Sequence, residues 1–392
     1  MTRTIAVNTG GGDAPGLNAV IRAVAVSAHW RGWRVLGILH GYRGLIEHGT
    51  DGVLELDRSA VRGIGHLGGT ILGSTNRGDP FRYPVMTDGK LVPTDVSELV
   101  VRRMRELGID DVVAIGGDGS TALAMKLLER GMPRVVAVPK TIDNDLPGTD
   151  VTFGFDTAVA TATEAIGRLH TTAAAHERVM VVEVMGRTAG WIALYAGIAG
   201  GADVVLIPEI PFDPRAVAEK IQRREARGRH FSIVVVAEGA RPAGGEMRYR
   251  ASADAFKEHG QLGGIAEYVA QEIATRTGKE TRTVVLGHLQ RGGSPVASDR
   301  VLALRLGCAA TRFIAERSES GLVAVRRGEI ELVPLEEGTR RLRTVPLDDR
   351  VLQTGRDLGL CFGDENEGTF HPSIPAPPFV ELSPPKSGAV GQ

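Results

Sequence analysis

The chain has 392 residues, of which 46 are Lys or Arg and 47 are Asp or Glu, so its formal net charge is -1. This balance leaves no overall basic field for nucleic acid or an anionic membrane. With 42% apolar and 24% charged residues, the chain can bury a core, and disorder is excluded for most of it.

Two features predict the compartment. The N-terminal residues reach a glycine before any apolar run of signal length, so no export signal is expected. The two cysteines, Cys308 and Cys361, allow at most one disulfide and no metal cluster, which is typical of a reduced compartment. We therefore expect a cytoplasmic protein.

In chain order, β-branched runs alternate with glycine turns and with stretches whose apolar residues have helical spacing. Strands are predicted at 4–7, 111–115, 134–138, 179–184, 233–237 and 284–286, and helices at 17–28, 121–130 and 189–199. The strands are continuously apolar, which predicts parallel sheets covered by helices on both faces. Segment 189–207 contains Asp203 and four glycines, so it predicts a helix that runs into a buried strand and not a membrane span.

Polar residues follow these strands directly. Ligands on parallel sheets bind at the carboxyl ends of the strands, which is where the turns at 10–16, 116–121, 139–145 and 185–187 lie. Any one turn has the alternative of simply connecting a strand to a helix. Several glycine turns that carry Asp, Lys, Thr or Arg favour a ligand site, and the 51 glycines fit close backbone approaches.

Two of these turns are suited to phosphate. The turn GGGDAPG at 10–16 offers backbone N–H groups and a helix N-terminus, but it matches neither the Walker motif nor the dinucleotide fingerprint. In GGDGST at 116–121, the glycines let the backbone close on a triphosphate, and Asp118 is an oxygen ligand of the kind Mg²⁺ requires. An Asx turn or a helix N-cap is the alternative for Asp118.

The turn PKTIDND at 139–145 places two aspartates beside a threonine. A carboxylate there can accept the proton of an attacking alcohol while a metal offsets charge on the transferred phosphoryl group; a solvated turn is the alternative. Cations farther along the chain suit a second phosphate group. They are His176, Arg178, Arg187, Arg282, His288 and Arg291.

Taken together, these motifs resemble the 6-phosphofructokinase family, in its bacterial ATP-dependent or mixed-substrate branch. The matching segments are GGDAPGLN at 11–18, GGTILG at 68–73, GGDGS at 116–120, TIDND at 141–145, VEVMGR at 182–187 and LGHLQRGGSP at 286–295. The resemblance runs from about Thr4 to Ala310 and implies an α/β fold. It implies two Rossmann-like three-layer domains with mostly parallel sheets and an active site in the cleft between them.

The resemblance also implies a division of the chain. A phosphoryl-donor domain is expected at 1–155 plus about 290–340, and a sugar-phosphate domain at 156–289 plus the C-terminal segment. The proline-rich tail at 371–392 is predicted to be an extended arm or a disordered end without a site.

The implied reaction is the glycolytic, Mg²⁺-dependent transfer of a phosphoryl group from ATP to the 1-hydroxyl of fructose 6-phosphate, which gives fructose 1,6-bisphosphate and ADP. Asp143 matches the catalytic base, with Thr141 and Ile142 beside it in the substrate loop. Asp118 matches the metal ligand. The donor-phosphate residues are Gly12, Gly117, Gly119 and Ser120, with Arg77 as a nucleotide-side cation. The sugar-phosphate site is matched by Arg178, Met185, Gly186, Arg187, Glu238, Arg282, His288, Leu289, Gln290 and Arg291.

Three of those matches bear on assembly and on charge. Arg178 and Arg282 match cations that this family donates across a subunit interface, which implies a homo-oligomer, a dimer or a tetramer, whose monomer is inactive. Arg187 is expected to offset charge in the transition state. No nucleic-acid or membrane partner is expected.

Gly119 and Lys140 bear on the phosphoryl donor in opposite ways. Pyrophosphate-dependent relatives typically have aspartate at the position of Gly119, where its side chain fills the space of the nucleotide α-phosphate, and Lys140 resembles that branch. Glycine leaves the space open, and the extra charge of Lys140 is compatible with ATP, so we expect ATP. A pyrophosphate-dependent fructose 6-phosphate 1-phosphotransferase is the alternative.

Two rival hypotheses come from other classes of protein. Lipid and NAD kinases share the GGDG loop, but they are not expected to carry segments 139–145 and 286–295 together. A non-catalytic nucleotide sensor would need a broken site, whereas the chain keeps Asp118, Thr141, Asp143 and Arg187.

Overall fold

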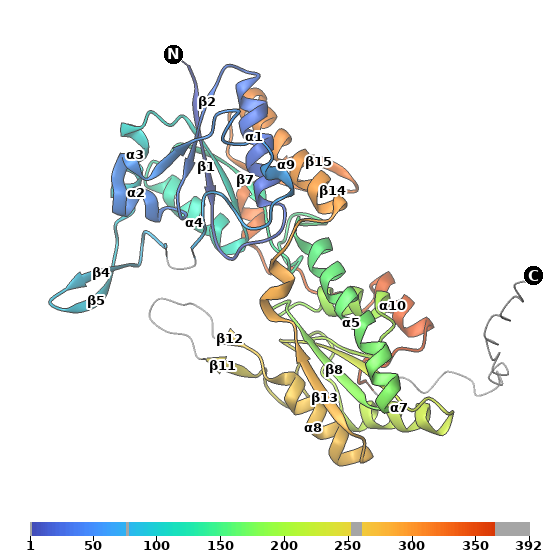
Figure 1. Ribbon diagram of the computed structural model, residues 1–392. Helices are drawn as coiled ribbons and strands as arrows, with labels where there is room; N and C mark the ends of the chain where they lie inside the picture. The colour runs from blue at the N-terminus through green and yellow to red at the C-terminus, as the bar shows by residue number, and fades with distance from the viewer. Residues whose placement is uncertain (1, 76–77, 252–260, 365–392) are drawn as a thin grey trace, which may run out of the picture.

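Two sheets organise the computed structural model of the chain, in which residues 2–75, 78–251 and 261–364 are described (Figure 1). The first sheet has the strand order β15-β14-β7-β6-β1-β2-β3 and the second has the order β13-β8-β10-β9. Each sheet lies between two layers of helices, so the predicted pair of three-layer, mostly parallel α/β units is confirmed.

The first sheet is parallel except at its two edges, where β3 and β15 run antiparallel to their neighbours. Its strands are β1 (Thr4–Thr9), β2 (Arg34–Ile38), β3 (Val53–Glu55), β6 (Asp111–Gly116), β7 (Arg134–Pro139), β14 (Gly321–Arg326) and β15 (Glu329–Val333). Its helices are α1 (Leu17–His29), α2 (Arg43–His48), α3 (Ser97–Glu106), α4 (Asp118–Glu129) and α9 (Ala297–Glu316).

Alternation along the central strands explains the layering of this sheet. In β1, Ile5 and Val7 face the core formed with α1 and α9, whereas Ala6 faces the core formed with α2, α3 and α4. Because both faces are covered, all six residues of β1 are buried, and the strand is continuously rich in apolar residues.

The second sheet is parallel throughout. Its strands are β8 (Val179–Val184), β9 (Val204–Leu206), β10 (Ser232–Ala237) and β13 (Thr281–Val285). Its helices are α5 (Phe155–His176), α6 (Trp191–Ala199), α7 (Pro214–Ala226), α8 (Ile265–Thr277) and α10 (Arg350–Asp357). The apolar residues of α5, α6 and α10 share one core with the sheet, and those of α7 and α8 share the other.

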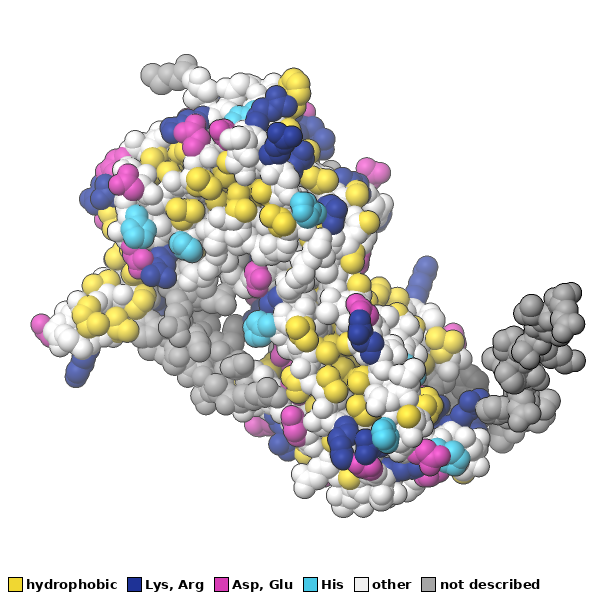
Figure 2. Space-filling model, in the orientation of Figure 1, with side chains coloured by type: hydrophobic (Ala, Val, Ile, Leu, Met, Phe, Trp, Pro, Cys, Tyr) yellow, Lys and Arg dark blue, Asp and Glu magenta, His cyan; other side chains and the backbone are white. Residues whose placement is uncertain are grey.

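Short elements complete the described chain. They are the hairpin strands β4 (Tyr83–Thr87) and β5 (Lys90–Thr94), the pair β11 (Tyr249–Ala251) and β12 (Gln261–Leu262), and the 3-10 helices η1 (Gly49–Asp51), η2 (Ile64–His66), η3 (Gly287–Arg291) and η4 (Leu335–Thr339). The β4–β5 hairpin projects from the first unit (Figure 1), and Figure 2 shows apolar side chains gathered on it. Met86 and Leu91 are among these exposed side chains.

The segment 189–207 forms a helix that runs into a buried strand, as predicted: α6 is followed by β9, whose residues are fully buried. Among the residues that the structure describes, no helix is both long and apolar enough to cross a membrane. Neither cysteine forms a disulfide; Cys308 is exposed and Cys361 is buried.

One strand prediction is wrong in its environment. The buried strand expected at 284–286 is β13, which lies at the edge of the second sheet and is largely exposed. It pairs with β8 on one side only, and Arg282, Thr283 and Val285 are exposed. Leu286 is buried but follows the strand. The domain boundaries stay predictions, and the tail at 371–392 lies outside the described residues.

Candidate active site

A cavity of about 1020 Å³ opens at the carboxyl ends of β1, β6 and β7 and is closed on the other side by Arg187, which follows β8. The structure brings eleven of the sequence-predicted site residues to its walls: Gly12, Gly117, Asp118, Gly119, Ser120, Lys140, Thr141, Asp143, Arg187, His288 and Arg291. The strand-end placement expected from the sequence is therefore what the fold produces, because parallel neighbours end at the same edge.

The wall built by β6 and α4 depends on glycine at one point and leaves space at another. A Cβ on Gly116 would lie 2.2 Å from the Cβ of Ser120, so the first turn of α4 can approach β6 only if residue 116 has no side chain. A Cβ on Gly119 would meet nothing within 4 Å. The cavity is therefore open above Gly119.

Asp118 is the first residue of α4, and its side chain is 36% exposed on the cavity side. Its Oδ1 lies 3.6 Å from Nη1 of Arg187. Within the described ranges, no group of three or more His, Cys, Asp or Glu side chains is arranged to hold a metal ion. Mg²⁺ commonly takes one or two carboxylates and completes its shell with water and substrate phosphates, so Asp118 at the cavity wall fits that mode of binding.

Two buried carboxylates follow β7, and Thr141 organises them. The Thr141 hydroxyl accepts the backbone N–H of Asp143 at 3.0 Å and donates to Oδ1 of Asp145 at 3.3 Å. Asp143 and Asp145 are each 3% exposed, and Oδ1 of Asp143 and Oδ2 of Asp145 have no hydrogen-bond partner among the described residues. Such oxygens are available to a substrate hydroxyl or to a cation.

Burial governs the titration of these carboxylates. Loss of solvation raises the pKa of Asp143, although Arg291, Arg187 and Lys140 oppose the rise. Burial, together with the neighbouring Asp143 charge, raises the pKa of Asp145 to about 7. Since the two carboxylates interact, their protons are shared over a common range of pH.

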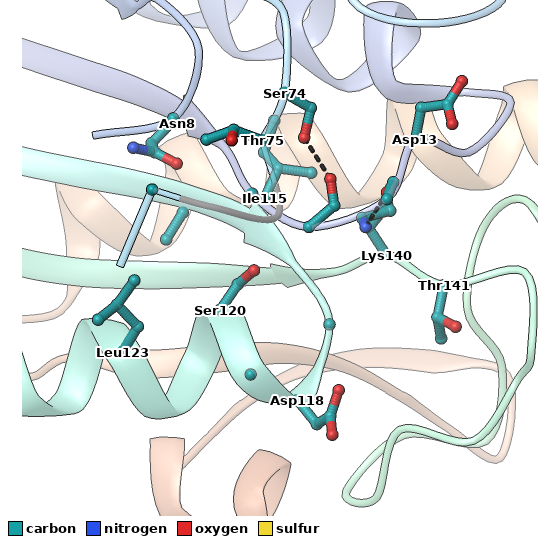
Figure 3. Close-up of a pocket in the computed structure, with 18 of the residues that line it drawn as sticks. Asn8, Asp13, Ser74, Thr75, Ile115, Asp118, Ser120, Leu123, Lys140 and Thr141 are labelled. Atoms are coloured by element: carbon teal, nitrogen blue, oxygen red, sulfur yellow. Dashed lines mark hydrogen bonds between the residues drawn. The ribbon is translucent and has the colours of Figure 1, made fainter. Parts of the chain in front are cut away.

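Three cations, Arg291, Arg187 and Lys140, surround the carboxylates. The Lys140 ammonium donates to the carbonyl of Gly12, and burial followed by the Arg291 charge lowers the pKa of Lys140 to about 8. Arg291 donates from Nη1 to the carbonyl of Asp13 at 2.9 Å. Figure 3 shows Lys140 and Thr141 on one side of the cavity and Asp118 at the beginning of α4 on the other.

Arg187 has a backbone conformation that is uncommon outside glycine, with a φ of 51°. Its N–H donates to Oε1 of Glu238 at 3.0 Å. Burial is the main reason that the pKa of Glu238 rises to about 7. In this chain Glu238 therefore supports the backbone of Arg187 and does not line the cavity.

Several sequence-predicted residues lie next to the cavity without lining it. Ile142 is fully buried behind the carboxylate turn, and Gln290 is fully buried in η3. Leu289, in contrast, is 69% exposed. The others in this group precede Arg187 on the loop after β8: Met185 and Gly186.

Arg178 and Arg282 lie at the amino ends of β8 and β13, whereas the cavity lies at the carboxyl ends of the strands. Both pair with Glu280; Nε of Arg178 is 2.7 Å from Oε2 of that carboxylate. A single chain thus does not bring these arginines to the cavity, and their role across an interface stays a prediction. Arg77 lies outside the described residues.

Part of the cavity wall on the nucleotide side was not predicted from the sequence. The missed residues are Asn8, Asp13, Tyr42, Thr70, Ser74, Thr75, Asp79, Arg82, Leu123 and Lys126. One signal was available: Ala122 and Lys126 are spaced four residues apart on the helix predicted at 121–130, so they share a face. The loop residues carried no periodic signal.

The model of the family described as Phosphofructokinase matches residues 4–314. The chain belongs to the phosphofructokinase family. The resemblance drawn from the motifs is thereby confirmed, and the lipid-kinase and NAD-kinase alternative is excluded.

Curated relatives match this phosphofructokinase over nearly their whole length. The protein named ATP-dependent 6-phosphofructokinase in Chloroflexus aggregans is 52% identical over 362 residues, which are 92% of this chain and 98% of the relative. The Amycolatopsis methanolica protein named pyrophosphate–fructose 6-phosphate 1-phosphotransferase is 51% identical over 346 residues, 87% of this chain and 96% of the relative. The crystal structure of Pichia pastoris phosphofructokinase in the T-state superposes with a TM-score of 0.74 at 33% identity, over 86% of this chain and 35% of that longer one.

Proposed function

We propose that this phosphofructokinase transfers the γ-phosphoryl group of ATP to the 1-hydroxyl of fructose 6-phosphate and produces fructose 1,6-bisphosphate and ADP. One observation carries the proposal: Asp118, Asp143 and Arg187 come from three different strand ends and line the same cavity. Phosphoryl transfer needs such an arrangement, because its catalysis consists mainly of positioning and of offsetting charge.

Asp143 accepts the proton of the sugar hydroxyl in this proposal. Its Oδ1, which has no hydrogen-bond partner in the described ranges, can receive that proton. Burial raises the pKa of Asp143 and makes it a stronger base, while Arg187, Arg291 and Lys140 favour the ionised form. The opposed effects suit a base that must be charged before the reaction and protonated after it.

Charge on the transferred group is offset from two sides. Arg187 lies between Asp118 and Asp145, with Nη1 3.6 Å from the first carboxylate and 4.0 Å from the second, so it faces the space over both. Asp118 would hold Mg²⁺, which when bound withdraws charge from the phosphoryl oxygens. Lys140, whose ammonium contacts the Gly12 carbonyl, extends the cationic wall toward the donor phosphates.

The shape of the cavity favours ATP as the donor. The space above Gly119 is open, and the cavity continues along α4 to Lys126 and across to Tyr42 and Asp79. Its volume of about 1020 Å³ is at the upper end of the usual range for small-molecule sites and exceeds what a pyrophosphate fills. Pyrophosphate is the second candidate, supported by Lys140 and by the name of the Amycolatopsis relative.

Assays with ATP and with pyrophosphate on a matched set of variants test the proposal that ATP is the donor. We expect wild-type enzyme to turn over with ATP and Gly119→Asp to lose about 100-fold in kcat/KM for ATP, because like charges brought together cost several kcal/mol. Gly119→Asn has the same size without the charge, so it separates steric filling from repulsion. Robust wild-type turnover with pyrophosphate and none with ATP would refute the donor assignment.

The position of the predicted sugar-phosphate arginines is the reason to expect an oligomer. Arg178 and Arg282 need a second subunit to reach a cavity, and β13 offers an exposed edge with Val285 and Leu289 also exposed. We propose a cytoplasmic homo-oligomer, a dimer or a tetramer, with shared sites. Arg282→Ala and Asp143→Asn should each be nearly inactive alone and regain activity when they are co-refolded, because a mixed pair contains one intact site; no regain would exclude sharing.

A further inference from the structure

A short segment near the C-terminus, residues 343–345, bridges the two loops that carry the proposed catalytic groups. It lies outside the residues 4–314 that the family model matches. On one side it contacts the carboxylate turn after β7, and on the other it contacts the beginning of α6, which follows the Arg187 loop.

The contact with the carboxylate turn involves both side chain and backbone. Nε and Nη2 of Arg343 donate to the carbonyl of Asn144 at 3.1 and 3.0 Å. The backbone N–H of Arg343 donates to the carbonyl of Asp145 at 2.7 Å. The two side-chain bonds join residues that are 199 positions apart in the chain.

Asn144 is the residue whose conformation sets the directions of the two carboxylates. It stands between Asp143 and Asp145 with a φ of 53°, in the left-handed region, which asparagine adopts more readily than most residues other than glycine. Its Oδ1 accepts the backbone N–H of Thr152 at 3.2 Å. A bidentate guanidinium on its carbonyl adds a second restraint, so the peptide cannot turn without breaking these bonds.

The contact with α6 holds the other catalytic loop. Nε1 of Trp191 donates to the carbonyl of Arg343 at 3.2 Å, and the Arg343 guanidinium carbon lies 4.6 Å from the centre of the Trp191 ring. Oε1 of the half-buried Glu209 accepts the N–H of Val345 at 2.8 Å and that of Gly190 at 3.0 Å. Gly190 ends the loop after β8 that carries Arg187.

The contacts of Arg343 are those of a residue that orients the backbone of the carboxylate turn. A partly buried guanidinium ordinarily pairs with a carboxylate, and burial lowers the pKa of Arg343. No ion pair between described residues involves Arg343; its Nε and Nη2 donate to a backbone carbonyl instead. The full charge of an arginine is thus used to hold one peptide of the catalytic turn.

We propose that Arg343 is a positioning residue for phosphoryl transfer, which fixes the Asp143–Asp145 turn relative to Arg187 by clamping the Asn144 carbonyl. The inference rests on the proposed function. It predicts a loss in kcat with little change in substrate binding, because Arg343 is not among the residues that line the cavity.

The test uses side-chain variants of the full-length enzyme. Arg343→Met keeps the apolar stem over Trp191 and removes both donors, and Arg343→Lys restores one charge without the planar fork. Arg341→Gln is an exposed control two residues before Arg343. We expect Arg343→Met to lose about 10- to 100-fold in kcat, since misplacement by about 1 Å costs up to 10²-fold. Arg343→Lys should be intermediate and the control unchanged, with KM for ATP and fructose 6-phosphate within about threefold throughout.

A double variant separates positioning from general weakening of the fold. If Arg343 acts through the carboxylate turn, Arg343→Met adds less than about threefold to the loss caused by Asp143→Asn, because the two effects are then not additive. Full additivity, an unchanged kcat in Arg343→Met, or loss of the folded state in both Arg343 variants would overturn the inference while leaving wild-type activity intact. A wild-type chain that does not phosphorylate fructose 6-phosphate would overturn the proposed function and this inference with it.

Discussion

Replacement of the buried carboxylate in Asp143→Asn is the most direct test of the proposed chemistry. Asparagine has the same shape as aspartate, and Oδ1 of Asp143 has no hydrogen-bond partner within the described part of the chain, so the change breaks no bond seen there. The N–H of Asp143, which donates to Thr141 at 3.0 Å, is retained. The substitution therefore removes basicity and leaves the geometry of the turn in place.

The expected loss follows from the role of the lost group. A positioned general base contributes about 10²–10⁴-fold, which corresponds to an increase of about 2.7–5.4 kcal/mol in the activation free energy. KM for ATP should change little, because the donor-phosphate wall at Gly117 and Ser120 is untouched. Tm should not fall, since a buried carboxylate without a hydrogen bond is replaced by a neutral group.

A coupled assay of ADP release with purified Asp143→Asn measures this loss. Asp88→Asn is the matched control, because Asp88 is exposed at the tip of the β4–β5 hairpin and its positive φ of 48° suits asparagine as well as aspartate. The reasoning would be refuted by a kcat for Asp143→Asn near that of the wild type, or by a large drop in Tm that makes the kinetic loss a folding effect.

Two further outcomes test the electrostatics and the packing. Burial raises the pKa of Asp143, and below that pKa the carboxyl is protonated and cannot act as a base. As the pH decreases, kcat should therefore begin to fall at a pH above the pKa of an ordinary aspartate. A fall in kcat at the ordinary aspartate pKa would contradict the assignment of Asp143 as the base. Asp299 accepts the N–H groups of Gly154 and Thr157 and the Thr157 hydroxyl, at 2.6–2.8 Å, so Asp299→Ala leaves buried donors without partners. Urea titration should show a loss of about 3 kcal/mol in the free energy of unfolding, and a change below about 1 kcal/mol would mean that these donors are satisfied in another way.

Much of the fold and of the site could be predicted from local patterns. The central strands β1, β6, β7 and β8 are buried on both faces, so each appears in the sequence as an unbroken apolar run. The turns after them carry the polar residues of the cavity. Because parallel strands end at one edge, order along the chain was enough to predict that Asp118 and Asp143 would meet.

Other features depend on residues that are distant in the chain. The segment 284–286 is apolar, as in a buried strand, yet β13 (TRTVV) is largely exposed, and among the described residues no strand pairs with its outer edge. The wall around Thr75 and Asp79 comes from a loop that has no periodicity. No local pattern reports such environments, since exposure depends on what packs against a segment.

The carboxylate turn after β7 separates what the sequence determines from what only the folded structure determines. Its residue types follow from the sequence, because a base and a neighbouring anion can be recognised by chemistry alone. Its conformation does not, because Asn144 is held in a left-handed geometry by Arg343, 199 residues later. Hydrogen bonds and desolvation act through space, so the direction of the carboxylates, their raised pKa values and their distance from Arg187 are set only when the chain has folded.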